Sequence, residues 1–319
     1  MTPSQPQGTQ SEALYRAIVF TFADEDILTV TPHPCLSLWE RERTFTVEPS
    51  TQAEIMLHSA LINVMVKAAR RAGRSLKRDL GEVENLQVSM KGPANFVTMA
   101  DRRAEEMLCS DLSKARPGYG FIGEEGGNRI GEDKTHTWIV DPLDGTTNFL
   151  HGIPQFAISI GLQREGTMIA GVIYNPANDE LYTAERGKGA FLNDQRLPVA
   201  GRRKLSDCVI ACGLPHIGRG DHELSRLEMT EIQNRVAGLR RFGAASLDMA
   251  FVAAGRLDGY WERNLQAWDM AAGQIMVREA GGIVSGIEGD DDPLKTGNVI
   301  CGNEFIHAEL VKILKPLGK

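Results

Sequence analysis

The chain has 319 residues, of which 42% are hydrophobic and 24% are charged, as in ordinary globular proteins. Its formal net charge is -7, from 35 basic and 42 acidic residues, which argues against a general nucleic-acid-binding protein. No apolar run approaches the roughly 18 residues of a membrane span, so no membrane partner is expected. The apolar stretch 13–23 is followed by acidic residues rather than a cleavage site, so the cytoplasm is the expected location.

The first 55 residues differ in pattern from the rest of the chain. They are rich in proline and polar residues near their start and show no sustained hydrophobic period, which predicts a poorly ordered N-terminal extension, 1–55. Two explanations stay open. Either the start codon is assigned too early and the working protein begins at Met56, or the segment is a targeting or regulatory arm.

Regular elements are predicted from there on. Thr51 and Glu54 have capping-box spacing, and the helical period that follows predicts a helix to about Leu80. A second helix is expected from Thr98 or Asp101 to the residues before 117–118. Strands are predicted at 137–140, 156–162, 169–174, 181–183, 190–192, 208–212, 257–261, 283–285 and 299–301, and further helices at 245–254, 270–280 and 304–313. This mixture favours an α+β protein with layered helices and sheets.

The cysteines and histidines give no sign of a metal site. Five scattered cysteines, an odd number, predict no disulfide framework and a reducing compartment. Cys208 and Cys212 lie in one apolar run with no second pair of ligands nearby, so we interpret them as buried strand residues rather than zinc ligands. The seven histidines show no metal-binding spacing.

Three segments place acidic side chains beside turn-forming residues at the ends of apolar runs. They are G-E-E-G-G at 123–127, D-P-L-D-G-T-T-N at 141–148 and W-D-M-A-A-G at 268–273. In the middle segment Pro142 forces a turn after Asp141, and Asp144 returns a second carboxylate to the same side, with the Leu143 carbonyl between them. The segment 145–147 then opens a helix, whose free N–H groups can bind phosphate.

Convergence of Glu124, Asp141, Asp144 and Asp269 would require cations, because buried like charges repel each other by several kcal/mol. Oxygen ligands favour magnesium or manganese over zinc. Two such ions about 4 Å apart stabilise both the attacking and the leaving oxygen of a phosphoryl transfer. For one segment alone, ordinary turn acids and helix caps are an equal alternative, whereas three segments together favour a shared site.

These motifs, with V-T-M-A-D at 97–101, resemble those of the inositol monophosphatase family from about Met56 to the C-terminus. The resemblance implies a layered αβαβα sugar-phosphatase fold over 56–319, like that of fructose-1,6-bisphosphatase, with two fused subdomains, about 56–200 and 201–319. It also implies a cytoplasmic, lithium-sensitive phosphoric monoester hydrolase that forms a homodimer. Two to three Mg²⁺ ions are expected at each site, with Mn²⁺ as a substitute.

The resemblance also assigns metal ligands. A first magnesium ion is expected on Glu124, Asp141 and the Leu143 carbonyl, and a second on Asp141, Asp144 and Asp269. A third, weaker ion is expected near Glu124.

The same resemblance assigns the groups around the phosphate. The attacking water near Glu124 is oriented by Thr146, whose hydroxyl is held by Asp101. Backbone N–H groups of Gly145 and Thr146 bind the phosphate. Lys91 matches a lysine at the phosphate entrance, although a solvated surface lysine is an equal alternative.

Other matching positions indicate the substrate contacts and the branch of the family to which the sequence is most similar. In the family, Gly243, Ala244, Ala245 and Glu262 match residues that contact inositol hydroxyls, and Asp144 serves there as a hydroxyl acceptor too. The sequence T-N-F at 147–149 resembles the inositol branch rather than the nucleotide-bisphosphate or histidinol-phosphate branches. The expected reaction is hydrolysis of myo-inositol 1-phosphate. Fructose-1,6-bisphosphatase or broad sugar phosphatase activity remains open.

A binding role is the alternative from another class. Some bacterial members of this family have a role with the transcription and ribosomal-RNA machinery that is separable from catalysis. The basic pairs 202–203 and 240–241 are candidates for such a surface, although solvated faces explain them more simply. Because all the catalytic motifs are intact, we interpret such a role as an addition to catalysis.

Overall fold

The structure is a computed structural model that describes residues 58–80, 99–126, 128–289 and 292–318 in full. Elsewhere it gives only the backbone of two antiparallel strand pairs, β1 (Ile18–Phe22) with β2 (Leu28–Pro32) and β3 (Val88–Gly92) with β4 (Asn95–Thr98). The chain divides into two compact units, Met1–Leu57 and His58–Lys319. Apart from β1 and β2, the predicted extension 1–55 and its capping box lie outside the described residues.

The larger sheet has the strand order β12-β11-β10-β9-β8-β7-β5-β6. Its strands are β5 (Tyr119–Gly123), β6 (Asn128–Arg129), β7 (Asp133–Asp144), β8 (Ala157–Arg164), β9 (Thr167–Asn175), β10 (Glu180–Glu185), β11 (Gly189–Leu192) and β12 (Gln195–Arg196). Neighbours from β7 to β12 are antiparallel and consecutive along the chain; short turns join β8 to β12, whereas the connection from β7 to β8 contains a helix. Strand β5 instead runs parallel to β7, so both strands end at the same edge.

Two helices cover one face of the larger sheet. Helix α3 (Ala60–Leu80) packs on β8 and β9, and α4 (Met99–Ala115) packs on β7. The buried side of α3 is a stripe at helical spacing that includes Ile62, Met65 and Leu76. Both helices were predicted from this kind of spacing. Helix α4 and the end of α3 are confirmed, but α3 begins at Ala60, next to Ser59 whose hydroxyl accepts from the Ile62 backbone, rather than after Glu54.

The other face of the larger sheet is covered by α7 (Ala245–Ala253) and α8 (Ala267–Glu279), which separate it from a second sheet. Helix α8 is buried continuously over 270–277 because it is enclosed on both sides. A Cβ atom on Gly171 of β9 would lie 2.9 Å from the carbonyl oxygen of Ala272. Glycine at this position therefore lets α8 approach the sheet closely.

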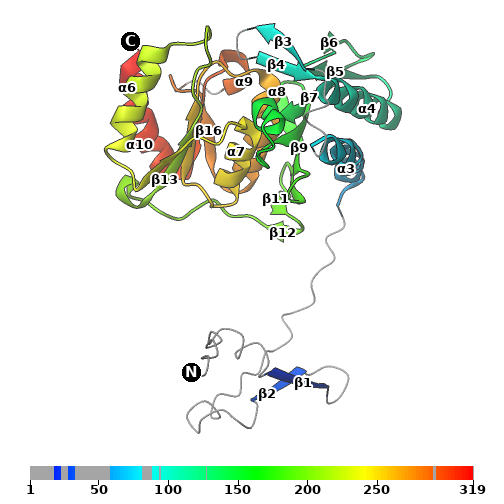
Figure 1. Ribbon diagram of the computed structural model, residues 1–319, viewed down its shortest axis with the longest axis horizontal. Coiled ribbons are helices and arrows are strands. Elements are labelled where there is room, and N and C mark those ends of the chain that lie inside the picture. The colour runs from blue at the N-terminus through cyan, green and yellow to red at the C-terminus, as the bar shows by residue number, and fades with distance from the viewer. Residues whose placement is uncertain are drawn as a thin grey trace, which may run out of the picture. The chain divides into compact units, whose positions relative to one another are not determined.

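The smaller sheet has the strand order β14-β13-β15-β17-β16. Its strands are β13 (Val209–Cys212), β14 (Gly238–Arg240), β15 (Gly259–Glu262), β16 (Ile283–Ser285) and β17 (Val299–Gly302). Strands β13, β14 and β15 are parallel, and β17 is antiparallel to β15. Helices α6 (His222–Gln233) and α10 (Glu304–Leu314) cover its outer face, away from α7 (Figure 1). The predicted order of layers, αβαβα, is confirmed.

The remaining short elements connect these layers. They are α5 (Thr146–Leu150), α9 (Pro293–Thr296) and two 3₁₀ turns at Leu205–Asp207 and Lys315–Gly318. The thiols of Cys109, Cys208, Cys212 and Cys301 are free and buried, while Cys35 lies outside the described residues. The predicted burial of Cys208 and Cys212 is confirmed, but only Cys212 lies on the strand β13, because that strand begins at Val209. Within the described ranges, no helix combines the length and apolar character that crossing a membrane needs.

Candidate active site

The turn at the end of β7 is built by backbone geometry. The backbone N–H of Leu143 donates to Oδ1 of Asp141 at 2.9 Å, and the pairing of β7 with β8 is irregular between Asp141 and Asp144. Gly145 has φ 89° and precedes α5, the predicted helix. A Cβ atom on Gly145 would lie 2.9 Å from a backbone oxygen, so both the positive φ angle and the lack of space require glycine here. The strand itself runs to Asp144 rather than ending at Asp141, because pairing resumes after the irregularity.

Thr146 joins this turn to α4. Its hydroxyl lies 3.2 Å from Oδ1 of Asp101 and 3.1 Å from the carbonyl oxygen of Leu143, and it can donate to either. Asp101 is buried in the first turn of α4. The fold thus brings together Thr146 and Asp101, which are far apart in the sequence. The side chain of Lys91 lies outside the described residues.

The loop that carries Glu124 is held by Glu105, a residue that the sequence analysis missed. Glu105 is buried on α4, and its Oε2 accepts a hydrogen bond of 2.7 Å from the backbone of Glu125. A Cβ atom on Gly123 would lie 2.5 Å from the same oxygen, and one on Gly126 would overlap the other carboxylate oxygen. The glycines of the G-E-E-G segment therefore make room for Glu105, which positions the Glu124 loop.

Two further acids are fixed at helix N-termini. Oδ2 of Asp144 accepts hydrogen bonds from the backbone (2.7 Å) and the hydroxyl (2.5 Å) of Ser246, in the first turn of α7. Oδ2 of Asp269 accepts from the backbone N–H of Gln266 at 2.7 Å, as part of the capping box of α8. Ser246 was also missed, because its role depends on a contact between distant segments.

Glu124, Asp141, Asp144 and Asp269 line a single cavity, and we call these four residues the acid floor. Burial raises the pKa of Asp141 well above its usual value, and repulsion from the other three acids raises it further. Burial likewise raises the pKa of Asp269, with added repulsion from Asp144 and Glu124. The pKa of Asp144 rises to about 6 by burial, against the opposing effect of its hydrogen bonds to Ser246.

The acid floor suits an oxygen-binding divalent cation. The raised pKa values of Asp141, Asp144 and Asp269 indicate that the protein does not itself offset the negative charge of these three carboxylates. Among the described residues, no group of three or more His, Cys, Asp or Glu side chains already has the arrangement that holds a metal ion. Magnesium is usually bound through one or two carboxylates together with waters and substrate phosphate. The acid floor fits this open kind of site rather than a preformed cage.

Another part of the cavity is formed by the ends of strands of the smaller sheet, and we call it the polyol side because the sequence resemblance places the substrate hydroxyls there. Glu262 ends β15, accepts a hydrogen bond from the Tyr260 hydroxyl, and lines the cavity with Gly243 and Ala245. Burial and repulsion from Asp144 raise the pKa of Glu262 to about 7, although the hydrogen bond from Tyr260 opposes the rise.

Two neighbours of this side define its shape. A Cβ atom on Gly213 would overlap the Glu262 carboxylate, so this glycine, missed in the sequence, makes room for the acid. Ala244 does not line the cavity: it is buried, and its Cβ lies 3.2 Å from the position of a Cβ on Gly145. The Asn148 side chain donates to the carbonyl of Phe242 at 2.8 Å and so ties α5 to the loop before Gly243.

The whole cavity has a volume of about 380 Å³. Small-molecule sites span roughly 300 to 1,000 Å³, so this one suits a small ligand. It brings together Gly145, Thr146 and Leu143 with the acid floor and with Glu262.

Comparison with known proteins decides the family. A sequence model described as the inositol monophosphatase family matches residues 57–318. The chain belongs to this family. It is 62% identical to an inositol-1-monophosphatase from Mesorhizobium japonicum, over 82% of this chain and 99% of the relative. Members of the inositol monophosphatase family are metal-dependent. Because the chain belongs to this family and resembles inositol-1-monophosphatases closely, it is a phosphoric monoester hydrolase.

Other relatives within the family carry a different name. The chain is 40% identical to the Nus factor SuhB of Pseudomonas aeruginosa, over 80% of this chain and 96% of the relative. A crystal structure of the extragenic suppressor protein suhB from Bartonella henselae superposes with a TM-score of 0.79 at 60% identity, and covers 81% of this chain and 99% of that one.

Proposed function

We propose that this enzyme hydrolyses the phosphate ester of a small polyol with magnesium as cofactor, and that myo-inositol 1-phosphate is its principal substrate. The observation that carries the proposal is the acid floor, which lines the same cavity as Glu262. Four acids from three separate segments suit the metals of phosphoryl transfer, and Glu262 supplies a buried acceptor for a hydroxyl. The relatives named inositol-1-monophosphatase support the same substrate.

The metal ligands in this proposal are the acid floor and the carbonyl oxygen of Leu143. Glu124 and the Leu143 carbonyl would serve one ion, Asp144 and Asp269 another, and Asp141 both. Two to three Mg²⁺ ions, or Mn²⁺ in their place, would supply the positive charge that offsets the acids and the phosphate.

The remaining groups position the reactants. With its proton donated to Asp101, the Thr146 hydroxyl keeps oxygen lone pairs that accept a hydrogen bond from the attacking water. Backbone N–H groups of Gly145 and Thr146 would hold the phosphate oxygens, with Lys91 at the entrance. Asp144 and Glu262 would accept hydrogen bonds from substrate hydroxyls, beside Gly243, Ala244 and Ala245.

Phosphate release from a substrate panel tests the proposal. The panel is inositol 1-phosphate, fructose 1,6-bisphosphate, histidinol phosphate and adenosine 3′,5′-bisphosphate, each with Mg²⁺ and then with Mg²⁺ plus lithium. We expect inositol 1-phosphate to be hydrolysed efficiently, lithium to inhibit by competing for a magnesium position, and the two nitrogenous substrates to be poor. Efficient hydrolysis of histidinol phosphate alone would contradict the choice of substrate.

A second role, in transcription, is favoured by the relatives named Nus factor SuhB. We propose it as an addition to catalysis, in a cytoplasmic homodimer. An Asp141→Asn variant that still recovers RNA polymerase from a cytoplasmic extract supports a separate binding role. Failure of both the wild type and this variant to recover polymerase contradicts it. Light scattering of the purified protein measures the subunit number.

A further inference from the structure

Tyr260 lies two residues before Glu262 on β15. Side chains two apart in a strand point to the same face of the sheet, so Tyr260 and Glu262 share a face. Tyr260 belongs to the core shared with α7 and α8, whereas Trp261, between the two residues, belongs to the core on the opposite face. The Tyr260 side chain is completely buried, because β15 is an interior strand between β13 and β17. A buried tyrosine hydroxyl usually needs a hydrogen-bond partner inside the protein.

The partner of the Tyr260 hydroxyl is the carboxylate of Glu262. In the described part of the chain the hydroxyl makes one hydrogen bond, to Oε2 of Glu262. Glu262 lines the cavity, and its Oε1 accepts no hydrogen bond from any described residue. Gly213 packs so closely that a Cβ atom on it would lie 2.0 Å from each carboxylate oxygen. The carboxylate is therefore held between a donor and a glycine, with one oxygen left for a ligand.

The direction of this hydrogen bond follows from the protonation of Tyr260. Burial raises the pKa of the Tyr260 hydroxyl well above its usual value, and repulsion from Glu262 and Asp248 raises it further. The hydroxyl therefore keeps its proton and donates, and Glu262 accepts. Burial raises the pKa of Glu262 to about 7, and the hydrogen bond from Tyr260 opposes this rise more than the charge of Arg241 does. Tyr260 thus favours the charged form of Glu262, which is the stronger acceptor for a hydroxyl.

We propose that Tyr260 is a positioning residue for polyol recognition: its hydrogen bond fixes the Glu262 carboxylate so that Oε1 is presented to a substrate hydroxyl. The inference rests on the proposed phosphatase function and deepens it, because Tyr260 does not itself line the cavity and acts through Glu262. An acceptor that is already fixed loses less side-chain entropy when the substrate binds. It also keeps the distance and direction that a hydrogen bond requires.

The alternative is a purely structural role, in which Glu262 only satisfies the buried hydroxyl of Tyr260. The two roles give different results for pairs of substrates. Loss of a structural contact lowers stability and affects all substrates alike. Loss of a positioning contact affects only the substrate whose hydroxyl Glu262 binds, and it changes KM rather than kcat if that contact is equally strong in the ground state and the transition state.

The experiment measures kcat and KM with saturating Mg²⁺ for inositol 1-phosphate and for an aryl phosphate without hydroxyl groups. We expect Tyr260→Phe to raise KM for inositol 1-phosphate by about 3- to 10-fold, the cost of ordering one free side chain on binding. Its kcat for this substrate should change by less than about twofold. Neither constant for the aryl phosphate should change by more than about twofold, because no hydroxyl contact is present to be lost.

A double variant tests whether Tyr260 acts through Glu262. Glu262→Ala removes the carboxylate that Tyr260 is proposed to fix. Adding Tyr260→Phe to Glu262→Ala should then change KM for inositol 1-phosphate by less than about twofold, because residues that act through one contact are not additive.

Tyr182→Phe is the matched control. Tyr182 is also completely buried, and its hydroxyl donates at 3.0 Å to Oε2 of Glu180, two residues away on β10 and outside the cavity. This variant removes the same atom from the same kind of contact and should leave both substrates unchanged. Circular dichroism checks the fold of each variant.

A second variant decides the question if Tyr260→Phe does not fold. Glu262→Asp keeps the charge but is shorter, so it withdraws the carboxylate from the Tyr260 hydroxyl. Positioning predicts a similar rise in KM for inositol 1-phosphate alone, and an unchanged KM would overturn the inference.

Equal losses for the two substrates, no loss for either, or an undiminished effect of Tyr260→Phe in the Glu262→Ala background would overturn the inference and leave the phosphatase function standing. A wild-type enzyme that hydrolyses the aryl phosphate but not inositol 1-phosphate would overturn the proposed substrate, and the inference with it. Release of phosphate from neither substrate would overturn the proposed function itself.

Discussion

The acid floor and the basic residues His216, Arg219 and Arg241 line one cavity, but the protein holds them in different ways. Asp141, Asp144 and Asp269 are each fixed by a hydrogen bond from a backbone N–H group, at the end of a strand or the start of a helix. Arg219 and Arg241 extend from loops without a partner in the described part of the chain. The protein therefore fixes the acids that the proposed reaction needs, whereas these two arginine side chains have no fixed partner among the described residues.

Removing one acid of the floor should have the largest effect. Asp141→Asn should lower kcat by about 10³-fold, because groups that stabilise the transition state electrostatically are worth this much. Asp269→Asn should do the same. Phosphate release measures the effect, and thermal melting shows whether the fold is intact. Residual activity above about a tenth of wild type in both variants would show that the floor is not the reaction centre.

The floor should also make metal-free protein less stable as the pH rises. The folded pKa of Asp144, about 6, lies above its usual value of 3.8, so between these values the folded state binds more protons than the unfolded state. The contribution of Asp144 to the free energy of unfolding is therefore fully present below about pH 4. It is lost as the pH rises through about 6, and the loss amounts to about 3 kcal/mol. Magnesium should reverse the loss at pH 7, since it binds the folded state.

Melting temperatures at pH 5, 6 and 7, with a chelator or with Mg²⁺, measure this effect. We expect a fall of several degrees from pH 5 to pH 7 with the chelator, and a smaller fall in an Asp144→Asn variant. A melting temperature that does not change over this range in the chelated protein would mean that the acids do not repel one another as the structure implies.

Substitution of Glu262 tests recognition of the substrate hydroxyls separately from the reaction at the acid floor. Glu262→Gln should lower kcat/KM for inositol 1-phosphate by about 10- to 100-fold, as expected for hydrogen bonds to a charged group. Gly213→Ala should act similarly, because its Cβ atom would overlap the Glu262 carboxylate. An aryl phosphate without hydroxyl groups is the control substrate, and it should be much less affected. Equal losses on both substrates would assign Glu262 to the reaction rather than to recognition.

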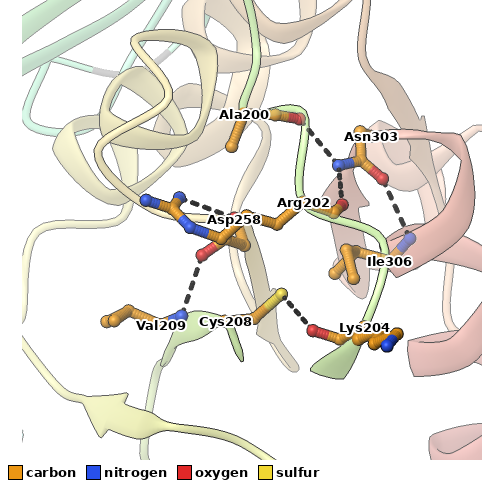
Figure 2. A network of polar contacts seen from close by, with 8 residues as sticks. All are labelled: Ala200, Arg202, Lys204, Cys208, Val209, Asp258, Asn303 and Ile306. Atoms are coloured by element: carbon orange, nitrogen blue, oxygen red, sulfur yellow. Dashed lines mark hydrogen bonds and ion pairs between the residues drawn. The ribbon is translucent and has the colours of Figure 1, made fainter. Parts of the chain in front are cut away.

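The smallest effect on activity should come from an arginine whose side chain has a structural role. Arg202 pairs at 3.0 Å with Asp258, which is 1% exposed and also accepts from the Val209 backbone (Figure 2). Arg202→Gln should reduce the free energy of unfolding by about 1–2 kcal/mol, because it leaves a buried acid without its counter-charge. Activity at low temperature should be unchanged.

The neighbouring Arg203 provides the control, measured by denaturant unfolding. It lies over the exposed ring of Phe305 at 4.4 Å, so Arg203→Gln should cost no more than about 0.5–1 kcal/mol. Arg241→Gln should cost as little, since Arg241 has no partner among the described residues. A large loss of stability in Arg241→Gln would mean that this side chain has a structural role.

The acid floor could be predicted from sequence because its parts are local. Asp141, Pro142, Asp144 and Gly145 specify a turn by themselves, and the helix after Gly145 is confirmed. The layered fold followed from helical and alternating patterns in long elements. Short strands such as β14 and the glycine-rich β5 were not predicted, because their patterns are too brief. Helix α6 was also missed, although its N-cap, Asp221, was a readable signal.

The supporting residues could not be predicted, because each acts across the fold. Glu105 looks like a solvent-facing acid on a helix, and only the folded chain places it against Gly123 and Gly126. The same holds for Gly213 beside Glu262. A glycine that leaves room for a carboxylate from a distant segment has no recognisable local sequence pattern. The basic pairs 202–203 and 240–241 looked alike in sequence, yet the structure gives their four members different surroundings.

Magnesium binding to chelator-treated protein, measured by calorimetry at pH 7, tests the central claim most directly. The acid floor predicts saturable binding to the wild type and to Glu106→Gln, which removes an exposed acid on α4, and loss of that binding in Asp141→Asn and Asp269→Asn. Unchanged magnesium binding in both floor variants would contradict the claim that these separated acids form one cation site.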